Sequence, residues 1–451
     1  MSKSTDIRIL EVSGSQQRVA YRTPIKFGGR VVDEATIVNM SITVETRDGR
    51  TGKGSGSMPM GVTWAWPTDA LSGEEALDAI LVFGQQAAMH ATGYDGWGHP
   101  LEIAHELSTE YADLAQRIAE GKELAEPIPR LAQLVASSPL HAALHDAYGK
   151  ALGANSYNLL GEEFCNRDLS AYLTSEFAGE YLDRYTLRQP KPRLPLYHLV
   201  GALDPLTNAD VASPVGDGLP ETLGQWIAQD GLTHLKIKLN GDELAWDVAR
   251  VVAVERVAVE SQAKRNCPAW KYSLDFNERC ASVDYVLGFL AQLRERSPAA
   301  LDRVQYIEQP THRDLAAHPE NKMHKAAAIK PVVIDESLVD LDSLLLAREL
   351  GYSGVALKAC KGHSEALLMG AAAQKFGMFL CVQDLTCPGL SFLHSASLAA
   401  RIPTVAAIEG NARQYCPAGN AAWADKYPGM FRISDGSLDT SVLTEPGLGY
   451  A

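Results

Sequence analysis

Three lysines stand near the ends of short apolar segments in the second half of the chain. Lys236 and Lys238 alternate with apolar residues in segment 234–239, and Lys358 lies near the end of segment 354–359. Residues two apart in a β-strand point to the same side, so the first two lysines should project together. A lysine beside a divalent cation or another ammonium has its pKa lowered toward the range where it can act as a base. These lysines are therefore candidates for proton transfer, although lysines at a strand edge often only extend into solvent.

Acidic residues end the three apolar segments that lie between these lysines. Asp275, Glu308 and Asp335 occupy these places, on consecutive predicted strands. One acidic residue there could simply cap the next helix, but three on adjacent strands converge on one point. Carboxylate oxygens are ligands that Mg²⁺ prefers, and no cluster of His and Cys indicates zinc. The sequence therefore predicts a Mg²⁺ site.

The third ligand has two candidates, because Asp335 is followed by Glu336. Adjacent residues of a strand face opposite sides, so only one of them can face the metal at a given depth. Asp335 directly follows the apolar residues 332–334, which favours it as the ligand. Glu336 is then expected to pair with a lysine.

These residues need a scaffold that brings strand ends together, and apolar segments alternate with helix-like segments from residue 195 onward. The predicted strands are 195–200, 234–239, 272–276, 304–308, 332–336, 354–359, 379–383 and 405–409. Eight strands joined by helices form a TIM-type barrel, with its active site at the carboxyl ends of the strands. An open, doubly wound sheet is the alternative. As a nucleotide binder it would carry a G-x-G-x-x-G motif, and neither that motif after the first strand nor a Walker A motif is present.

In a ring of eight strands the second and the sixth lie opposite each other. The carboxylates on the third, fourth and fifth strands fill the arc between Lys238 and Lys358. A ligand held on the metal would therefore have lysines on two opposite faces. A metal bound to a substrate carboxylate stabilises the enediolate that forms when the α-proton leaves.

The first part of the chain has a different pattern. Strand-like segments at 7–12 and 35–46 precede helix-like segments at 72–90, 101–120 and 139–152. Strands followed by a group of helices are typical of an α+β unit. Three prolines within 188–195 mark a linker. We expect an α+β domain with its linker at 1–190, a barrel domain at 191–415, and a segment at 416–451 that packs back toward the first domain.

Composition narrows the classes of function. The 451 residues include 41 Lys and Arg against 55 Asp and Glu, a formal net charge of −14, which disfavours nucleic acid and anionic membranes as partners. No apolar run approaches the length of a membrane-spanning helix, and the first residues lack the apolar core of a signal peptide. The seven cysteines form no C-x-x-C pair, as expected of reduced thiols. We expect a cytoplasmic location.

The ordered set of motifs resembles the enolase superfamily. The set comprises K-x-K at 236–238, Asp275-x-Asn277, Glu308-Gln309-Pro310, Asp335-Glu336-Ser337 and Lys358, with the segment 140–153 resembling the end of that family's capping domain. Within the superfamily the chain is similar to the two-lysine, muconate-lactonising-enzyme-like branch of the mandelate racemase/muconate lactonising enzyme family. A racemase-like enzyme would carry Asp on the sixth strand and His on the seventh. This chain has Lys358 and the segment 381–384 there, without His.

The resemblance implies the fold, the cofactor and the residue roles. The fold is a (β/α)7β TIM-type barrel with an N-terminal α+β capping domain, and Asp275, Glu308 and Asp335 bind Mg²⁺. Lys238 and Lys358 match the general acid/base pair, and Lys236 matches the lysine that helps to hold the enolate. Asn277 and Glu336 are expected to orient these groups. Asp384 and Glu409 are candidates for substrate contact, although Glu409 could equally form a buried pair with a lysine.

The resemblance also implies that two capping-domain loops, 23–30 and 55–66, close the barrel. Lys26 and Arg30 could bind a second anionic group, or both could be solvated. Gly28 and Gly29 suggest hinge-like freedom. The second loop is rich in Met and Trp, which indicates an apolar wall or part of the core. The segments 65–126 and 201–224 look longer than is usual in the family, and their role is open.

The predicted activity is Mg²⁺-dependent abstraction of the proton α to a carboxylate. Bases on both faces favour a racemase or epimerase acting on a small carboxylic acid. The alternatives are a lyase that uses the same intermediate, such as an acid-sugar or hydroxy-acid dehydratase, and a cycloisomerase. A non-catalytic relative is disfavoured, because every position expected to do chemistry holds a competent residue. No nucleic acid or membrane is expected to bind, and a homo-oligomer is expected.

Overall fold

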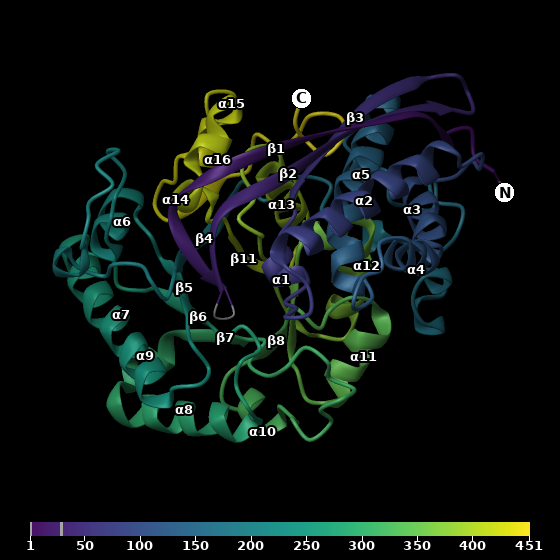
Figure 1. The fold of residues 1–451 in the computed structure, drawn as a ribbon. Helices are drawn as coiled ribbons and strands as arrows, with labels where there is room; N and C mark the ends of the chain where they lie inside the picture. The colour runs from purple at the N-terminus through teal and green to yellow at the C-terminus, as the bar shows by residue number, and fades with distance from the viewer. Residues whose placement is uncertain (1, 28–29) are drawn as a thin grey trace.

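The computed structural model describes residues 2–27 and 30–451. Its first part is an antiparallel sheet in the order β1–β2–β3, formed by β1 (Ile7–Phe27), β2 (Arg30–Thr46) and β3 (Thr51–Pro59). In Figure 1 the β1–β2 hairpin runs along the barrel and reaches down toward the barrel mouth. The helices that follow are α1 (Val62–Ala65), α2 (Gly73–Thr92), α3 (Pro100–Thr109), α4 (Tyr111–Gly121) and α5 (Arg130–Leu152).

Several predicted bounds of this part were wrong. The two predicted strands are longer than expected and form one hairpin. The described residues of the expected loop 23–30 form the far end of this hairpin. Gly28 and Gly29 lie outside the described residues. The expected loop 55–66 is the end of β3 followed by α1. The predicted helix 101–120 is two helices, because the chain turns at Glu110.

Helix α5 begins nine residues before the predicted start at Pro139, which lies inside it. A proline in a helix has no N–H for the carbonyl four residues earlier. Here the Ser138 hydroxyl donates to that carbonyl, of Val135, at 2.8 Å. The helix therefore continues through the proline.

Three glycines of β3 let α5 pack directly on the sheet. A Cβ atom at Gly54 would lie 2.2 Å from the carbonyl oxygen of Ala143, and Gly52 and Gly56 face the same helix as closely. Asp146 of α5 accepts hydrogen bonds from the N–H of Ser55 (2.9 Å) and of Leu448 (3.0 Å). The capping sheet, α5 and the C-terminal residues are thus held together. The division after residues 190 and 415 stays a prediction.

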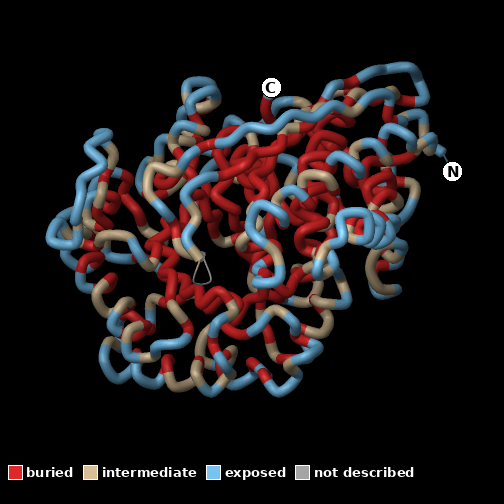
Figure 2. The backbone as a smooth tube through the Cα atoms, in the orientation of Figure 1, coloured by how far each residue is buried: buried red, intermediate tan, exposed pale blue. Residues whose placement is uncertain are grey.

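The second part is a closed barrel of parallel strands, as predicted. The eight strands are β4 (Arg193–Val200), β5 (His234–Lys238), β6 (Lys271–Asp275), β7 (Val304–Glu308), β8 (Val332–Ile334), β9 (Gly354–Leu357), β10 (Phe379–Val382) and β11 (Val405–Glu409). They pair in chain order, and β11 closes the ring on β4. The short strand β12 (Ser437–Asp439) adds to β4 in the antiparallel sense. Buried residues fill the barrel strands and α5 in Figure 2.

Helices cover the outside of the barrel. They are α6 (Leu223–Asp230), α7 (Leu244–Lys264), α8 (Val283–Arg296), α9 (Pro298–Arg303), α10 (His324–Ala327), α11 (Leu341–Glu349), α12 (His363–Lys375) and α13 (Leu390–Arg401). The short helices α14 (Ala412–Tyr415), α15 (Ala421–Ala424) and α16 (Pro428–Phe431) follow the last barrel strand. In residues 2–27 and 30–451, no helix is long and apolar enough to cross a membrane.

Candidate active site

Strand register brings the predicted site residues to one end of the barrel interior. A buried cluster inside the barrel contains Tyr306, Val333, Ala356, Cys381 and Ala407, one residue from each of β7 to β11. Residues two places further along a strand point to the same side. Those positions are Glu308, Asp335, Lys358, Gln383 and Glu409, all of them buried. Asp335, not Glu336, is therefore the residue that continues the inward series of β8.

Lys236 lies among three carboxylates. Its Nζ atom is 2.8 Å from Glu308 Oε1, 2.9 Å from Glu409 Oε2 and 3.0 Å from Asp275 Oδ2. Burial opposes the charged form of Lys236, but the carboxylates of Glu308 and Glu409 outweigh burial and raise the pKa of this lysine well above its usual value. Burial, followed by the neighbouring Asp275 charge, raises the pKa of Glu308.

Lys238 and Asp275 are paired across β5 and β6. The ammonium of Lys238 donates to Asp275 Oδ2 and to Asn277 Oδ1, the latter at 3.1 Å. Burial would raise the pKa of Asp275, but the charges of Lys238 and Lys236 outweigh it and hold that pKa below its usual value. Asn277 thus fixes the lysine through a direct hydrogen bond.

Asp335 lies between two lysines on the other side of the barrel mouth. Its Oδ2 atom is 3.0 Å from Lys358 Nζ, and its Oδ1 atom is 3.3 Å from Lys361 Nζ. Burial favours the neutral acid, but the two ammonium groups outweigh burial and lower the pKa of Asp335. Burial opposes the charge of Lys358, yet Asp335 raises the pKa of that lysine. Burial lowers the pKa of Lys361, and the charge of Lys358 adds to that effect.

Glu336 faces the capping domain. Its Oε1 atom accepts a hydrogen bond from the indole N–H of Trp64 at 3.0 Å, and its Oε2 atom has no hydrogen-bond partner. Burial, followed by the charge of Asp335, raises the pKa of Glu336 to about 8. The expected pairing of Glu336 with a lysine is replaced here by a tryptophan N–H.

Unusual backbone conformations hold the strand ends in place. Asn277, Glu278 and Gln309 have φ angles of +44°, +59° and +28°, which side-chain-bearing residues seldom adopt. The Gln309 side chain accepts from the N–H of Asp335 (2.9 Å) and donates to the hydroxyl of Ser337 (2.8 Å). The ends of β6, β7 and β8 are therefore fixed relative to one another.

Hydrogen-bond acceptors gather beside Lys236 and Lys358. Asp384 Oδ2 accepts from the N–H groups of Cys387 and Asn411, both at 3.2 Å, and the Asn411 amide donates to Glu409 Oε1 at 3.2 Å. The Oδ1 atoms of Asp384 and Asn411 are buried without a partner. Burial, then the charge of Glu409, raises the pKa of Asp384 to about 7. Glu409 forms a buried ion pair with Lys236. Such a pair with a lysine was the predicted alternative to a contact with the substrate.

The two basic residues of the hairpin lie further out. Lys26 Nζ is 3.5 Å from the Asn240 side chain, and Arg30 is paired with Asp69. Arg30 also lines a cavity of about 680 Å³ together with Asn277 and Glu336. The cavity lies between the capping segment and the barrel, beside Asn277 and Glu336.

The family model described as "Enolase C-terminal domain-like" matches residues 219–451, more than half of the chain and nearly all of the barrel. The chain belongs to the enolase superfamily, in its mandelate racemase/muconate lactonizing enzyme family. It is therefore an enzyme of this superfamily, as the sequence motifs predicted.

Known relatives agree with this membership. The chain is 25% identical over 270 residues to the L-Ala-D/L-Glu epimerase of Bacillus subtilis (strain 168), covering 58% of this chain and 69% of the relative. Its fold is similar to that of the dipeptide epimerase from Enterococcus faecalis V583, solved with Mg and the dipeptide L-Leu-L-Tyr (TM-score 0.62, 17% identity, 98% and 99% of the chains covered). It is also similar to the muconate lactonizing enzyme of Pseudomonas fluorescens, solved with muconolactone (TM-score 0.60, 19% identity, 98% and 96% covered).

The carboxylates of this superfamily member suit a hard cation. In residues 2–27 and 30–451, no three His, Cys, Asp or Glu side chains are placed so that they could hold a metal ion as they stand. The Lys236 ammonium lies among Asp275, Glu308 and Glu409. The predicted ligands Asp275, Glu308 and Asp335 nevertheless supply buried carboxylate oxygens, which are the donors that Mg²⁺ prefers. The residues present therefore fit the ion, which would take over the counter-charge that Lys236 supplies.

Sequence reasoning missed several residues of the superfamily site. Lys361 comes after β9 in a short 3-10 turn, so the alternation of β9 gave no signal for it. Trp64 lies within 55–66, which was expected to close the barrel, but it comes from α1 of the capping domain and no local pattern links it to a lysine. Gln383 donates to Glu308 Oε2 and could have been found, because it continues the period-two pattern of β10.

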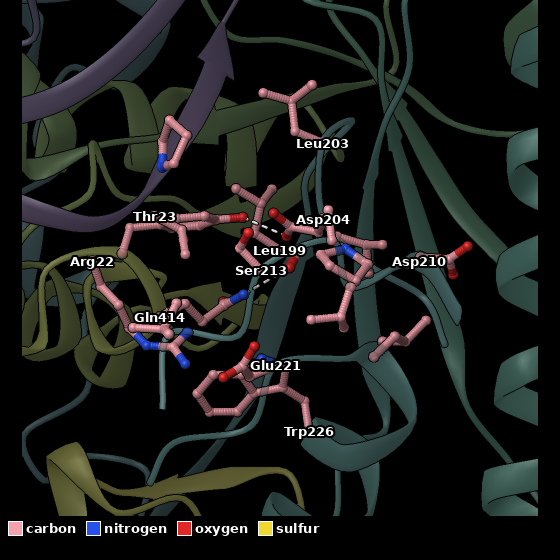
Figure 3. A pocket seen from close by; sticks show the side chains of 18 of the residues that line it. Arg22, Thr23, Leu199, Leu203, Asp204, Asp210, Ser213, Glu221, Trp226 and Gln414 are labelled. Atoms are coloured by element: carbon pink, nitrogen blue, oxygen red, sulfur yellow. Dashed lines mark hydrogen bonds between the residues drawn. The ribbon is translucent and has the colours of Figure 1, made fainter. Parts of the chain in front are cut away.

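A second cavity of about 260 Å³ lies beside the barrel mouth of this superfamily member, near the end of β4. Figure 3 shows Arg22 from the hairpin and Leu199, Asp204, Trp226 and Gln414 around it. The long segment 201–224 forms one of its walls. Its described lining includes none of the predicted site residues, so it is separate from the carboxylate cluster.

Proposed function

We propose that this enzyme removes the proton α to a substrate carboxylate and returns a proton to the opposite face, as a racemase or epimerase. The observation that carries the proposal is the placement of Lys238 at the end of β5 and of Lys358 directly after β9, the second and sixth strands of an eight-strand ring. Their ammonium groups contact different carboxylates, Asp275 and Asp335. A planar, deprotonated substrate between them can receive a proton from either side.

We assign the metal to Asp275, Glu308 and Asp335. Bound Mg²⁺ supplies positive charge that stabilises the oxygens of the substrate carboxylate as the α-proton leaves. Lys236 adds a buried ammonium on the same side, and the carboxylates of Glu308 and Glu409 raise its pKa against the effect of burial. Asn277 orients Lys238 through its amide oxygen. A lysine that has taken the proton is stabilised as an ammonium by its neighbouring carboxylate.

We propose dipeptides as the first substrate class to test, because the L-Ala-D/L-Glu epimerase is a relative of this chain. The unpartnered acceptors Asp384 Oδ1 and Asn411 Oδ1 could bind the ammonium end of such a substrate. The cavity of about 680 Å³ between the capping segment and the barrel leaves room for a side chain. Arg30 on its rim stays a candidate for a second anionic group, and Lys26 lies nearby.

Product analysis in D₂O tests this function. Dipeptides and other carboxylates are incubated with the enzyme and Mg²⁺, and exchange of the α-proton is followed by NMR while the products are separated. Racemisation or epimerisation with incorporation of deuterium is expected, and EDTA should abolish it. A dehydrated or lactone product would assign the enzyme to the lyase or cycloisomerase alternatives. Full activity in a verified metal-free sample would contradict the metal's role.

The setting of the enzyme is part of the same proposal. All seven cysteines are unpaired, and six of them are buried, which agrees with a reducing, cytoplasmic location. A homo-oligomer stays a prediction. Light scattering on a size-exclusion column measures the mass in solution directly, and a mass of one chain would refute it.

A further inference from the structure

Trp64 connects the capping domain to one half of the barrel mouth. It lies in α1, directly after the capping sheet, and only 5% of its surface is exposed. Its carbonyl oxygen accepts from Arg313 Nη2 at 3.0 Å, and Arg313 also pairs with Glu278 at the end of β6. The backbone of α1 is thus anchored to the barrel independently of the indole ring.

The indole ring contacts the side of the site that contains Lys358. Its N–H donates to Glu336 Oε1 at 3.0 Å, and the centre of the ring is 4.5 Å from Lys358 Nζ and 5.6 Å from Lys361 Nζ. An ammonium over the face of a buried tryptophan is attracted by the ring and loses much of its freedom to move. Lys238 lies on the opposite side, where its ammonium donates to Asp275 and Asn277.

We propose that Trp64 is a positioning residue that holds the Lys358 ammonium for proton transfer on one face of the substrate. The inference rests on the proposed function, because it assigns the two lysines to opposite faces of the substrate. A lysine side chain has four rotatable bonds, and the end of Lys358 is restrained by Asp335 at 3.0 Å and by the carbonyl oxygen of Asp384 at 3.3 Å. The ring adds a flat boundary for the same ammonium group.

The two contacts of Trp64 can be separated by substitution. Trp64→Phe keeps an aromatic face and loses the N–H that satisfies Glu336, whereas Trp64→Leu loses both. Trp66 is the matched control. It is also a buried tryptophan beside α1, and its N–H donates to Glu126. Trp66→Leu measures the general effect of removing a buried indole ring. It should slow α-proton exchange of the two isomers to the same extent.

Face-selective exchange is the readout. The probe is the pair of stereoisomers that the wild-type enzyme interconverts. Lys358→Ala identifies the isomer that loses its proton to Lys358, because this variant no longer exchanges the α-proton of that isomer. We expect Trp64→Leu to slow exchange of that isomer about tenfold or more, with little change in the other isomer. Trp64→Phe should recover most of the loss. Equal slowing of both isomers, or no slowing of either, would overturn the inference.

A crystal structure of Trp64→Leu gives a readout that needs no substrate. We expect the Lys358 side chain to leave its place while Lys238 keeps its contacts with Asp275 and Asn277. An unmoved Lys358 would overturn the role of Trp64 even if the enzyme is an epimerase. Failure of the proposed function looks different, because the wild-type enzyme would then exchange no α-proton in any dipeptide or carboxylate tested.

Discussion

The Nζ atom of Lys236 lies 2.8 Å from Glu308 Oε1 inside the barrel, and both side chains are almost fully buried. The pair joins β5 to β7 across the strand that carries Asp275. The ammonium therefore offsets the repulsion of carboxylates that would otherwise meet without a counter-charge. A bound cation would do the same, so Lys236 and Mg²⁺ should substitute for each other in stabilising the fold.

Lys236→Met should lower the free energy of unfolding of the metal-free enzyme by about 3–5 kcal/mol, because it leaves buried carboxylates unpaired. Mg²⁺ should restore more stability in this variant than in the wild type, as measured by urea unfolding with and without the ion. Lys53→Met, at an exposed position of β3, is the control and should change stability by less than about 0.5 kcal/mol. An equal response of both variants to Mg²⁺ would contradict this role of Lys236.

Substitution of a residue that only orients a metal ligand costs about 10–100-fold in metal affinity. Asp335→Asn removes a ligand itself, so it should weaken Mg²⁺ binding by at least as much. Glu336→Gln should reduce the rate more than the affinity, because Glu336 contacts Trp64 and continues the opposite side of β8. Isothermal titration with Mg²⁺ and steady-state kinetics separate the two effects. If Glu336→Gln abolished Mg²⁺ binding while Asp335→Asn kept it, the assignment would be reversed.

Much of the barrel could be predicted from the sequence, because parallel strands buried on both faces are apolar runs with recognisable ends. The predicted strands 304–308 and 405–409 coincide with β7 and β11. Period-two alternation also placed Lys236 and Lys238 on the interior side of β5, and the position of Asp275 at a strand end placed it beside them. These side chains come close together because the eight strands form a closed ring, and the number of predicted strands implied such a ring.

The hairpin and the contacts between domains could not be predicted in the same way. Residues 13–18 of β1 are all exposed and carry no apolar side chain, so no alternation marks this part of the strand. Pro139 marked a helix start by the usual rule, but α5 continues through it, and the Ser138 hydroxyl donates to the carbonyl that the proline leaves without an N–H. Trp64 meets Lys358 through docking of the capping domain, which no local spacing encodes.

Gly54→Ala tests the packing of α5 on the capping sheet. The added Cβ would lie 2.2 Å from a backbone carbonyl of α5, so strand and helix must separate. A loss of about 3 kcal/mol in the free energy of unfolding is expected. The control is Gly73→Ala, at the start of α2, where a Cβ meets nothing within 4 Å. It should be neutral or slightly stabilising. Similar losses in both variants would refute the close packing.

Buried histidines should make the fold sensitive to acid. His394 Nε2 accepts from the N–H of Ser57 at 2.9 Å, which requires a neutral ring, and burial lowers the pKa of His394 to about 3. The unfolded chain therefore binds more protons than the folded one below about pH 6.5, and stability falls as the pH drops from there toward 3. His394→Gln should make this decline about 1.4 kcal/mol per pH unit shallower in urea unfolding between pH 6 and 4. An unchanged slope would contradict the prediction.

The most direct test of the two-base account is α-proton exchange in D₂O by Lys238→Ala and Lys358→Ala with Mg²⁺ present, using both stereoisomers of the best wild-type substrate. The account predicts that each variant loses interconversion of the isomers but still exchanges the proton of one isomer, and that the isomer differs between the two variants. Racemisation by Lys358→Ala at the wild-type rate would contradict it, because the reaction would then need only one lysine.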